Sequence, residues 1–346
     1  MAVVMLTGAS GFLGTHIAQC LLDRGHQVRA LVRTPANLRE SLTALGVDPD
    51  DRRIDVVVGD MTDPGAAREA VTGCDQAVHA AATYSYRRPD AERMLRENTL
   101  GTTTVLDAAA GAGCSGIVHV SSVVALLRSG ATLDHRSPLG VPIGPYSRSK
   151  VESERAARAR QEAGAPITIV NPGGVIGPHD PTLGETNETV RDILLGRLPT
   201  WPRGGLQWVD VRDTADVVVA ALGRPGGRYF VPGDTIALPH APLRTVTGRR
   251  LPAVRVPLSA ALPVLQLGYR TGWSFLPHTV EGARLIAMDT RVDHSATTEE
   301  LGIRGRPLAD SMRDTVRWLV EAGHIPARAA GLCSPEDPKG VGAPTS

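Results

Sequence analysis

A glycine-rich turn near the start of the chain restricts its fold more than any other feature of the sequence. Three glycines, spaced G-x-x-G-x-x-G, follow the apolar run Ala2–Leu6 and open a helical pattern over Phe12–Arg24. Glycines permit a tight strand-to-helix turn and let backbone N–H groups approach a phosphate at the positive helix N-terminus. This context is typical of the first unit of a dinucleotide-binding domain. The residues expected to contact the dinucleotide are Thr7, Gly8, Ser10, Gly11, Phe12, Leu13 and Gly14.

The apolar runs that follow continue this alternation of strand and helix. Each is continuously apolar, which is typical of parallel strands that are covered by helices on both faces. The runs are Val28–Val32, Ile54–Val58, Ala77–His79, Ile117–Val120 and Ile167–Val170. The pattern therefore predicts an α/β fold, a Rossmann-type doubly wound parallel sheet with a smaller, mostly C-terminal α/β lobe.

After about residue 172 the pattern loosens into loops rich in proline and glycine and into shorter helices. One βα-like piece, Trp208–Val211 followed by Thr214–Leu222, is typical of a return to the main sheet. The last stretch is small, polar and contains proline, which favours disorder. The predicted limits are 1–172 with 205–231 for the dinucleotide-binding domain, 173–204 with 232–326 for a substrate-binding lobe, and 327–346 for a disordered tail.

The composition argues against several classes of protein. The 346 residues carry a net charge of +1, whereas nucleic-acid binders usually have a marked basic excess. No apolar run reaches the roughly 18 residues of a membrane span, and no basic segment precedes the first apolar run as in a secretory signal. The four cysteines lack the spacing of a metal site or a disulfide framework. We expect a cytoplasmic globular protein that binds a small molecule and no metal.

The residue after the second apolar run bears on the kind of dinucleotide. An NAD site usually places Asp or Glu about 20 residues beyond the glycines, where it binds the ribose 2′-OH. This chain has no acidic residue from Val28 to Ala36 and carries Arg33 at that place. An arginine there can pair with a 2′-phosphate, so the sequence favours NADP, with NAD as the alternative.

Short segments after the third and fourth runs complete the predicted cofactor site. Asp60 and Met61 are placed to contact the adenine edge. Small residues after the fourth run would let the cofactor lie against the backbone, and these are Ala80, Ala81 and Ala82.

A tyrosine and a lysine supply the candidate chemistry. Tyr146 and Lys150 are four residues apart, one turn along the same helix face. A lysine beside a phenol stabilises the phenolate and lowers a pKa that starts at about 10. Such a tyrosine can give a proton to a carbonyl oxygen or take one from an alcohol. The pair follows a fifth strand that ends in Ser121 and Ser122.

Together these motifs resemble the extended short-chain dehydrogenase/reductases, the epimerase/dehydratase superfamily, over about residues 2–325. The resemblance implies that Ser122 hydrogen-bonds the substrate oxygen and that Tyr146 is the acid/base. It further implies that Lys150 binds the nicotinamide ribose and that Asn98 supports the site. The segment implied to border the nicotinamide includes Pro172, Gly173 and Val175, and the family's V-x-D-x-A element is matched by Val211–Ala215.

Departures from the family pattern indicate to which branch of the superfamily the chain is most similar. Sugar-nucleotide 4,6-dehydratases carry Thr-Asp-Glu from the serine position, whereas this chain has Ser122-Val123-Val124. Sugar-nucleotide epimerases usually carry a diphosphate-clamping arginine where this chain has Leu206, although Arg203 is nearby. The chain is most similar to the dihydroflavonol reductase and 3β-hydroxysteroid dehydrogenase branch, in which the arginine after the second strand meets the NADP phosphate.

These features predict an NADP(H)-dependent ketone reductase or secondary alcohol dehydrogenase that acts on a fairly apolar small molecule. The alternatives are an NAD-retaining sugar-nucleotide epimerase and a catalytically idle, cofactor-sensing protein. The resemblance also implies a homodimer through the helices 91–110 and 145–163. The residues predicted to line the substrate site are Tyr84, Val123, Val124, His179 and Trp201.

Overall fold

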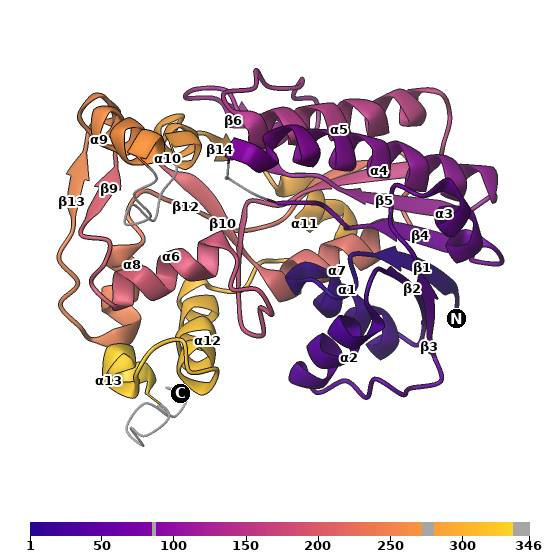
Figure 1. Cartoon of the computed structure of the whole chain (residues 1–346), viewed down its shortest axis with the longest axis horizontal. Coiled ribbons are helices and arrows are strands. Elements are labelled where there is room, and N and C mark those ends of the chain that lie inside the picture. The colour runs from indigo at the N-terminus through magenta and orange to yellow at the C-terminus, as the bar shows by residue number, and fades with distance from the viewer. Residues whose placement is uncertain (85–87, 272–279, 335–346) are drawn as a thin grey trace.

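The computed structural model describes residues 1–84, 88–271 and 280–334. In that part of the chain, seven parallel strands form the central sheet in the order β11-β7-β5-β4-β1-β2-β3 (Figure 1). Their bounds are β1 (Val3–Thr7), β2 (Gln27–Val32), β3 (Ile54–Val58), β4 (Gln76–His79), β5 (Gly116–Val120), β7 (Ile167–Asn171) and β11 (Arg228–Phe230). The strand order reverses between β1 and β4, and open α/β sheets bind their ligands at such a point. The predicted doubly wound α/β fold is confirmed.

Helices cover both faces of this sheet (Figure 1). One layer contains α1 (Phe12–Asp23), α2 (Pro35–Ala44), α7 (Val211–Ala221) and α11 (Ser295–Leu301). The other contains α3 (Pro64–Val71), α4 (Ala91–Gly111) and α5 (Pro145–Glu162). Two short 3₁₀ turns, Arg88–Asp90 and Val123–Ala125, precede α4 and follow β5.

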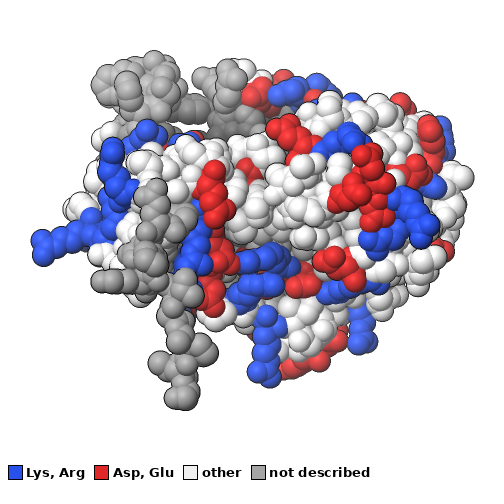
Figure 2. All heavy atoms as spheres, turned by 90° about the horizontal axis from the view of Figure 1, so that it is seen from below, with Lys and Arg blue, Asp and Glu red and all other residues white. Residues whose placement is uncertain are grey.

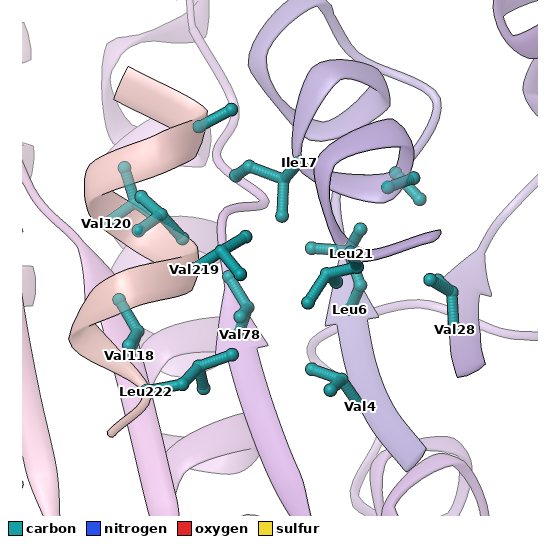
Figure 3. Close-up of a cluster of buried hydrophobic side chains, with 14 of the residues drawn as sticks. Val4, Leu6, Ile17, Leu21, Val28, Val78, Val118, Val120, Val219 and Leu222 are labelled. Atoms are coloured by element: carbon teal, nitrogen blue, oxygen red, sulfur yellow. The ribbon is translucent and has the colours of Figure 1, made fainter. Parts of the chain in front are cut away.

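Strand β1 divides its side chains between the two layers, because successive residues of a strand point to opposite faces. Val4 and Leu6 join the cluster beneath α1 and α7, whereas Met5 joins the one beneath α3, α4 and α5. All three are fully buried. Figure 3 shows the first cluster, in which Ile17 and Leu21 of α1 lie above β1 and the valines of β5 lie beside Val219 and Leu222 of α7.

The remaining elements form the second lobe and its links to the first (Figure 1). Three small sheets order as β12-β10-β8, β13-β9 and β14-β6. Their strands are β6 (Thr132–Leu133), β8 (Gly174–Ile176), β9 (Thr200–Pro202), β10 (Leu206–Asp210), β12 (Asp234–Ile236), β13 (Val254–Val256) and β14 (Arg291–Val292). The helices are α6 (Glu185–Leu194), α8 (His240–Thr247), α9 (Leu258–Thr271), α10 (Val280–Ala287), α12 (Leu308–Glu321) and α13 (Ala327–Ala330), with a 3₁₀ turn at Gly331–Cys333.

Two sequence expectations about this region are wrong. The strand expected at Trp208–Val211 does not join the main sheet, because β10 pairs with β8 and β12, and the returning strand is β11. The tail predicted to be disordered from residue 327 is ordered as far as 334, because Ala329, Ala330 and Cys333 are buried in the second lobe's core. Residues 335–346 lie outside the described part. The predicted domain limits otherwise stay a prediction.

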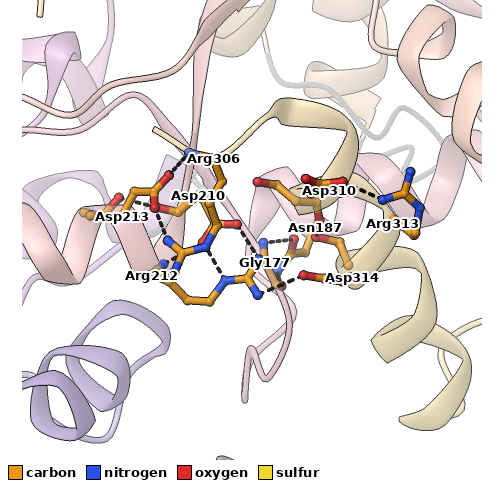
Figure 4. Close-up of polar contacts among 12 residues, drawn as sticks. Gly177, Asn187, Asp210, Arg212, Asp213, Arg306, Asp310, Arg313 and Asp314 are labelled. Carbon is orange, nitrogen blue, oxygen red and sulfur yellow. Dashed lines mark hydrogen bonds and ion pairs between the residues drawn. The ribbon is translucent and has the colours of Figure 1, made fainter. Parts of the chain in front are cut away.

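Ion pairs fasten α7 to the C-terminal segment (Figure 4). The Arg212 guanidinium donates to Asp210 at 2.7 Å and to Asp314 of α12 at 2.8 Å. Asp213 accepts the backbone N–H of Arg306 at 2.6 Å and also pairs with the Arg306 side chain. Since Asp213 is the acidic residue of the V-x-D-x-A element, this element acts here as a joint between the main sheet and the second lobe.

The surface and the helices show two further features. On the face drawn in Figure 2, basic and acidic side chains lie interspersed rather than gathered by sign. None of the described helices has the length and apolar character needed to cross a membrane.

Glu154 of α5 is a fully buried anion, and it ties three strands of the sheet to this helix. Its carboxylate accepts from Ser121 Oγ, just after β5, at 2.6 Å and from Asn171 Nδ2, in β7, at 2.7 Å. Arg158 donates at 2.6 Å, and the guanidinium of Arg228 in β11 lies at 3.3 Å. Buried charges are tolerated when they are paired and hydrogen-bonded in this way.

We therefore expect Glu154→Gln to lower the free energy of unfolding by about 3 to 5 kcal/mol, because it leaves two arginines with no buried counter-charge. Urea unfolding followed by circular dichroism measures this change. The matched control is Glu152→Gln on the same helix, whose exposed pair with Arg155 should contribute less than about 1 kcal/mol. Equal effects of the two substitutions would contradict the structural importance of the network.

Candidate active site

The glycine-rich turn is as tight as the motif requires. Gly8 has φ = 79°, and a Cβ on Gly14 would lie 1.9 Å from the Gly8 carbonyl oxygen. Gly11 is the N-cap of α1, and no side chain caps this helix. The first N–H groups of α1 therefore stay available for an anion, which fits the pyrophosphate of a dinucleotide.

The loop after β4 lies directly against this turn. A Cβ on Gly8 would lie 2.8 Å from the Ala81 nitrogen, and the Ala81 N–H donates to Thr7 Oγ1 at 3.2 Å. The structure thus brings the predicted cofactor residues of β1, α1 and 80–82 together at the point where the strand order reverses.

Arg33 is exposed after the end of β2, and its guanidinium forms no hydrogen bond or ion pair with any residue that the structure describes. Burial alone would raise the pKa of Asp60, but hydrogen bonds from Thr62 and the nearby charge of Arg33 leave it lowered. Met61 packs against α4, where a Cβ on Gly101 would lie 2.7 Å from its Sδ. The Arg33 guanidinium is therefore available to bind the 2′-phosphate of a dinucleotide.

Ser122, Tyr146 and Lys150 come together at the end of β5 and the start of α5. The Tyr146 and Ser122 side chains are hydrogen-bonded to each other, and Ser122 Oγ accepts the Val124 N–H at 3.2 Å. Burial raises the pKa of Tyr146 above its usual value, and the carboxylates of Glu185 and Glu281 raise it further. The phenol is therefore protonated at neutral pH and able to donate.

Lys150 lies one turn beyond Tyr146. Burial lowers its pKa to about 8, and the charge of Glu154 opposes this shift. Within the described residues the ammonium has no hydrogen-bond partner, so its donors are available to the hydroxyls of a bound ribose.

Asn98 has an architectural position. Its Oδ1 accepts the Thr83 N–H at 2.6 Å, and its Nδ2 donates to the Thr83 carbonyl at 2.8 Å and to Ser149 Oγ at 2.6 Å. It therefore fastens the loop after β4 to α5.

Two histidines that the sequence analysis did not single out lie beneath the site. The His79 and His119 rings stack with centroids 5.5 Å apart. His79 contacts Thr7 Oγ1 at 2.8 Å and Thr102 Oγ1 at 3.3 Å. Burial lowers the pKa of His79 to about 3, with the charge of Lys150 adding, so the ring is neutral.

Tyr84, one of the predicted substrate residues, lies against Tyr146. Its ring meets the Tyr146 ring edge to face, with centroids 4.8 Å apart, and its hydroxyl donates to Glu185. Nothing in the sequence pattern marked Glu185, because it arrives from α6 in the second lobe.

Three of the other four predicted substrate residues are buried. Val123 and Val124 are 1% and 8% exposed and pack in an apolar cluster beside Tyr146. Trp201, 3% exposed, lies in the core of the second lobe. Apolar side chains after a strand can line a cleft or pack into a core, and in this structure these three side chains are buried. His179 lies near Glu321 and Arg212, and burial lowers its pKa.

The segment predicted to border the nicotinamide begins beside Ser122. The Pro172 carbonyl accepts the Val123 N–H at 3.0 Å, and Ser122 Oγ lies 3.5 Å from it. Gly173 lies against β10, where a Cβ would be 2.5 Å from the Gln207 carbonyl oxygen, and Val175 pairs with Val209. Among the described side chains, no group of three or more His, Cys, Asp or Glu could hold a metal ion.

Comparison with known proteins agrees with this geometry. The model of the NAD dependent epimerase/dehydratase family matches residues 4–231. The chain is 33% identical to a Synechocystis protein named "Putative dihydroflavonol 4-reductase", over 92% of this chain and 95% of that protein. It is 30% identical to sterol demethylase protein B of Methylococcus capsulatus, over 93% and 99% of the two chains. It is 29% identical to a farnesyl-dihydroquinoline-oxide ketoreductase of Stigmatella aurantiaca, over 94% and 99%.

Solved structures show the same fold. The crystal structure of gox2253 is 30% identical and superposes with a TM-score of 0.77, covering 94% of this chain and 100% of that one. The dTDP-glucose 4,6-dehydratase of Streptomyces venezuelae, solved with NAD bound, is 25% identical with a TM-score of 0.71, covering 92% and 97%. The chain belongs to the NAD dependent epimerase/dehydratase family and is an NAD(P)-dependent oxidoreductase of the short-chain dehydrogenase/reductase type.

Proposed function

We propose that the protein is an NADP(H)-dependent ketone reductase or secondary alcohol dehydrogenase that acts on a fairly apolar small molecule. The observation that carries this proposal is the hydrogen bond between Ser122 and Tyr146, with Lys150 one turn away. These groups can hold a carbonyl oxygen and protonate it. Reductase and ketoreductase names among the relatives support the same reaction class.

In this proposal, residues of the chain bind the substrate oxygen and donate a proton to it. When it is bound, the nicotinamide dinucleotide supplies or accepts a hydride. Ser122 and Tyr146 donate hydrogen bonds to the substrate oxygen, and the raised pKa of Tyr146 keeps its proton in place until negative charge develops on that oxygen. The Lys150 ammonium, still protonated at neutral pH, then stabilises the phenolate that is left.

We propose NADP rather than NAD because of Arg33. Its guanidinium stands where an NAD enzyme would carry a carboxylate, and it is exposed and close enough to Asp60 to affect its pKa. A planar guanidinium can bind a 2′-phosphate with two parallel hydrogen bonds.

We also propose a cytoplasmic homodimer formed through α4 and α5. These helices lie side by side on one face of the sheet, where Arg160 binds Asp107 with two bonds of 2.6 and 2.7 Å (Figure 1). Leu100 of α4 is 46% exposed, which gives that face an apolar residue for a second copy to cover.

Replacement of the phenol tests the proposed acid. We expect Tyr146→Phe to lower kcat at least about 100-fold for ketones of a cyclic and aromatic panel, because proton transfer loses its donor. The Kd for NADPH should stay within about twofold, since the lysine and the glycine-rich turn are intact. Tyr229→Phe is the matched control, because its hydroxyl bonds Glu300 away from the site. Retained turnover in Tyr146→Phe would refute the assignment.

Arg33 is tested by cofactor binding alone. We expect Arg33→Ala to raise the Kd for NADPH about tenfold or more and to leave the Kd for NADH unchanged, because one charge-assisted contact is lost. Tryptophan fluorescence titration measures both constants. Arg39→Ala, on the next helix and paired with Asp50 at 2.7 Å, should change neither. An NADPH affinity that survives Arg33→Ala would contradict the proposed preference.

The pH dependence follows from the lysine. The pKa of Lys150 is lowered to about 8, so the ammonium is present below this pH and is lost as pH rises through it. We expect kcat/KM for NADPH in ketone reduction to fall above about pH 8. In Lys150→Arg the residual rate should stay level to about pH 9, because a guanidinium keeps its charge. A wild-type profile that is level to pH 10 would contradict this role of Lys150.

A further inference from the structure

The catalytic helix begins without a capping side chain of its own. Its N-cap is Gly144, and the first-turn N–H groups of Tyr146 and Ser147 need an acceptor. An N-cap Ser, Thr, Asp or Asn usually provides one. Here the carboxylate of Glu281, in α10, takes that place, because Tyr146 N–H donates to Oε2 at 3.1 Å and Ser147 N–H donates to Oε1 at 2.6 Å.

The glycine at the cap fits this arrangement. A Cβ on Gly144 would lie 2.3 Å from Glu281 Cδ, so a side chain at this position would displace the carboxylate. The backbone of Gly144 has φ = −172°, an extended conformation that any residue adopts. Glycine is therefore required here for space. Glu281 itself is 7% exposed, and its carboxylate accepts these two N–H groups at the positive end of α5.

The carboxylate is carried by a segment that is bonded along its length to the loop before α5. Arg284 Nη1 lies 3.4 Å from the Ile143 carbonyl, and Thr290 Oγ1 donates to the Arg128 carbonyl at 2.9 Å. β14 then pairs with β6. Since α10 packs against α9 of the second lobe, this segment, residues 280–293, connects that lobe to the start of the catalytic helix (Figure 1).

We propose that Glu281 is a positioning residue, which fixes the first turn of α5 and with it the Tyr146 phenol, so that the second lobe controls turnover through this carboxylate. This inference rests on the proposed role of Tyr146 as the proton donor. Glu281 touches the backbone of Tyr146 and acts through it, and a misplacement of about 1 Å at a reacting group can cost about 100-fold in rate.

The charge of Glu281 provides a second readout. Within the described residues, the Tyr146 phenol is faced by Glu185 of α6, by Glu281 of α10, and by Tyr84 and Ser122 from the loops after β4 and β5. Lys150 lies one turn further along α5. Both carboxylates raise the pKa of Tyr146. Loss of the Glu281 charge should therefore move the rise of alcohol oxidation with pH to lower pH, which a merely structural loss would not do.

The test compares Glu281→Gln with the wild type. We expect kcat for ketone reduction to fall about tenfold or more, with the Kd for NADPH unchanged, and the alkaline rise of alcohol oxidation to move to lower pH. Glu281→Asp keeps the charge and should keep the wild-type pH profile. The matched control is Asp293→Asn in the same segment, which removes a carboxylate that accepts the Ser295 N–H at 2.9 Å, and it should leave kcat and the profile unchanged.

Gly144→Ala tests the same contact from the other side. It should reproduce the loss of kcat, and the double variant with Glu281→Gln should be no slower than either single one, because both remove one interaction. Wild-type kcat in Glu281→Gln, an unshifted pH profile or additive losses would overturn the inference. Turnover retained in Tyr146→Phe would instead overturn the proposed function, so the two failures are distinguishable.

Discussion

The buried carboxylate of Glu154 is the interaction on which the geometry of the site depends. It accepts hydrogen bonds from Ser121 and Asn171, at the ends of β5 and β7, and it lies beside Arg228 of β11. Because Tyr146, Lys150 and Glu154 are spaced by four along α5, the anion holds the helix face that carries both catalytic candidates. The serine next to Ser121 is Ser122, so the same contact also fixes the residue that we propose binds the substrate oxygen.

The charges around this face keep each group in the protonation state that the proposed reaction needs. Burial and nearby carboxylates keep the Tyr146 phenol protonated, and Glu154 partly offsets the burial that lowers the pKa of Lys150. Neutral histidines beneath the lysine add no competing positive charge at neutral pH. An acid and a cation thus stand one helical turn apart, an arrangement suited to proton donation to a carbonyl oxygen.

The sequence predicted the parts of the fold and site that depend on local spacing. The glycine-rich turn and the Tyr146–Lys150 pair each occupy one strand–helix junction or one helical turn, and both motifs are legible within a few residues. The central sheet followed from the continuously apolar runs. The strands that pair with β10 could not be predicted, because a buried strand has the same apolar pattern in the central sheet and in a small sheet of the second lobe.

Contacts between distant segments account for the other differences. Val123, Val124 and Trp201 have the apolar character of a cleft lining. The fold buries the two valines beside Tyr146 and Trp201 in the core of the second lobe. Glu185 and Glu281 come from the second lobe and have no motif, so only the folded chain brings them to Tyr146. The sequence did contain a pattern that indicates Glu154, because this residue lies four positions after Lys150. For the capping function of Glu281 the sequence offered only the glycine at position 144, where a helix N-cap usually carries a polar side chain.

Transfer of deuterium from 4-deuterated NADPH to a ketone would demonstrate the proposed hydride transfer. We expect mass spectrometry to find one deuterium at the carbinol carbon of a reduced cyclic or aromatic ketone, with NADP released. Absence of transfer across the panel, together with tightly held NAD and activity on a diphosphate sugar, would contradict it and favour an epimerase.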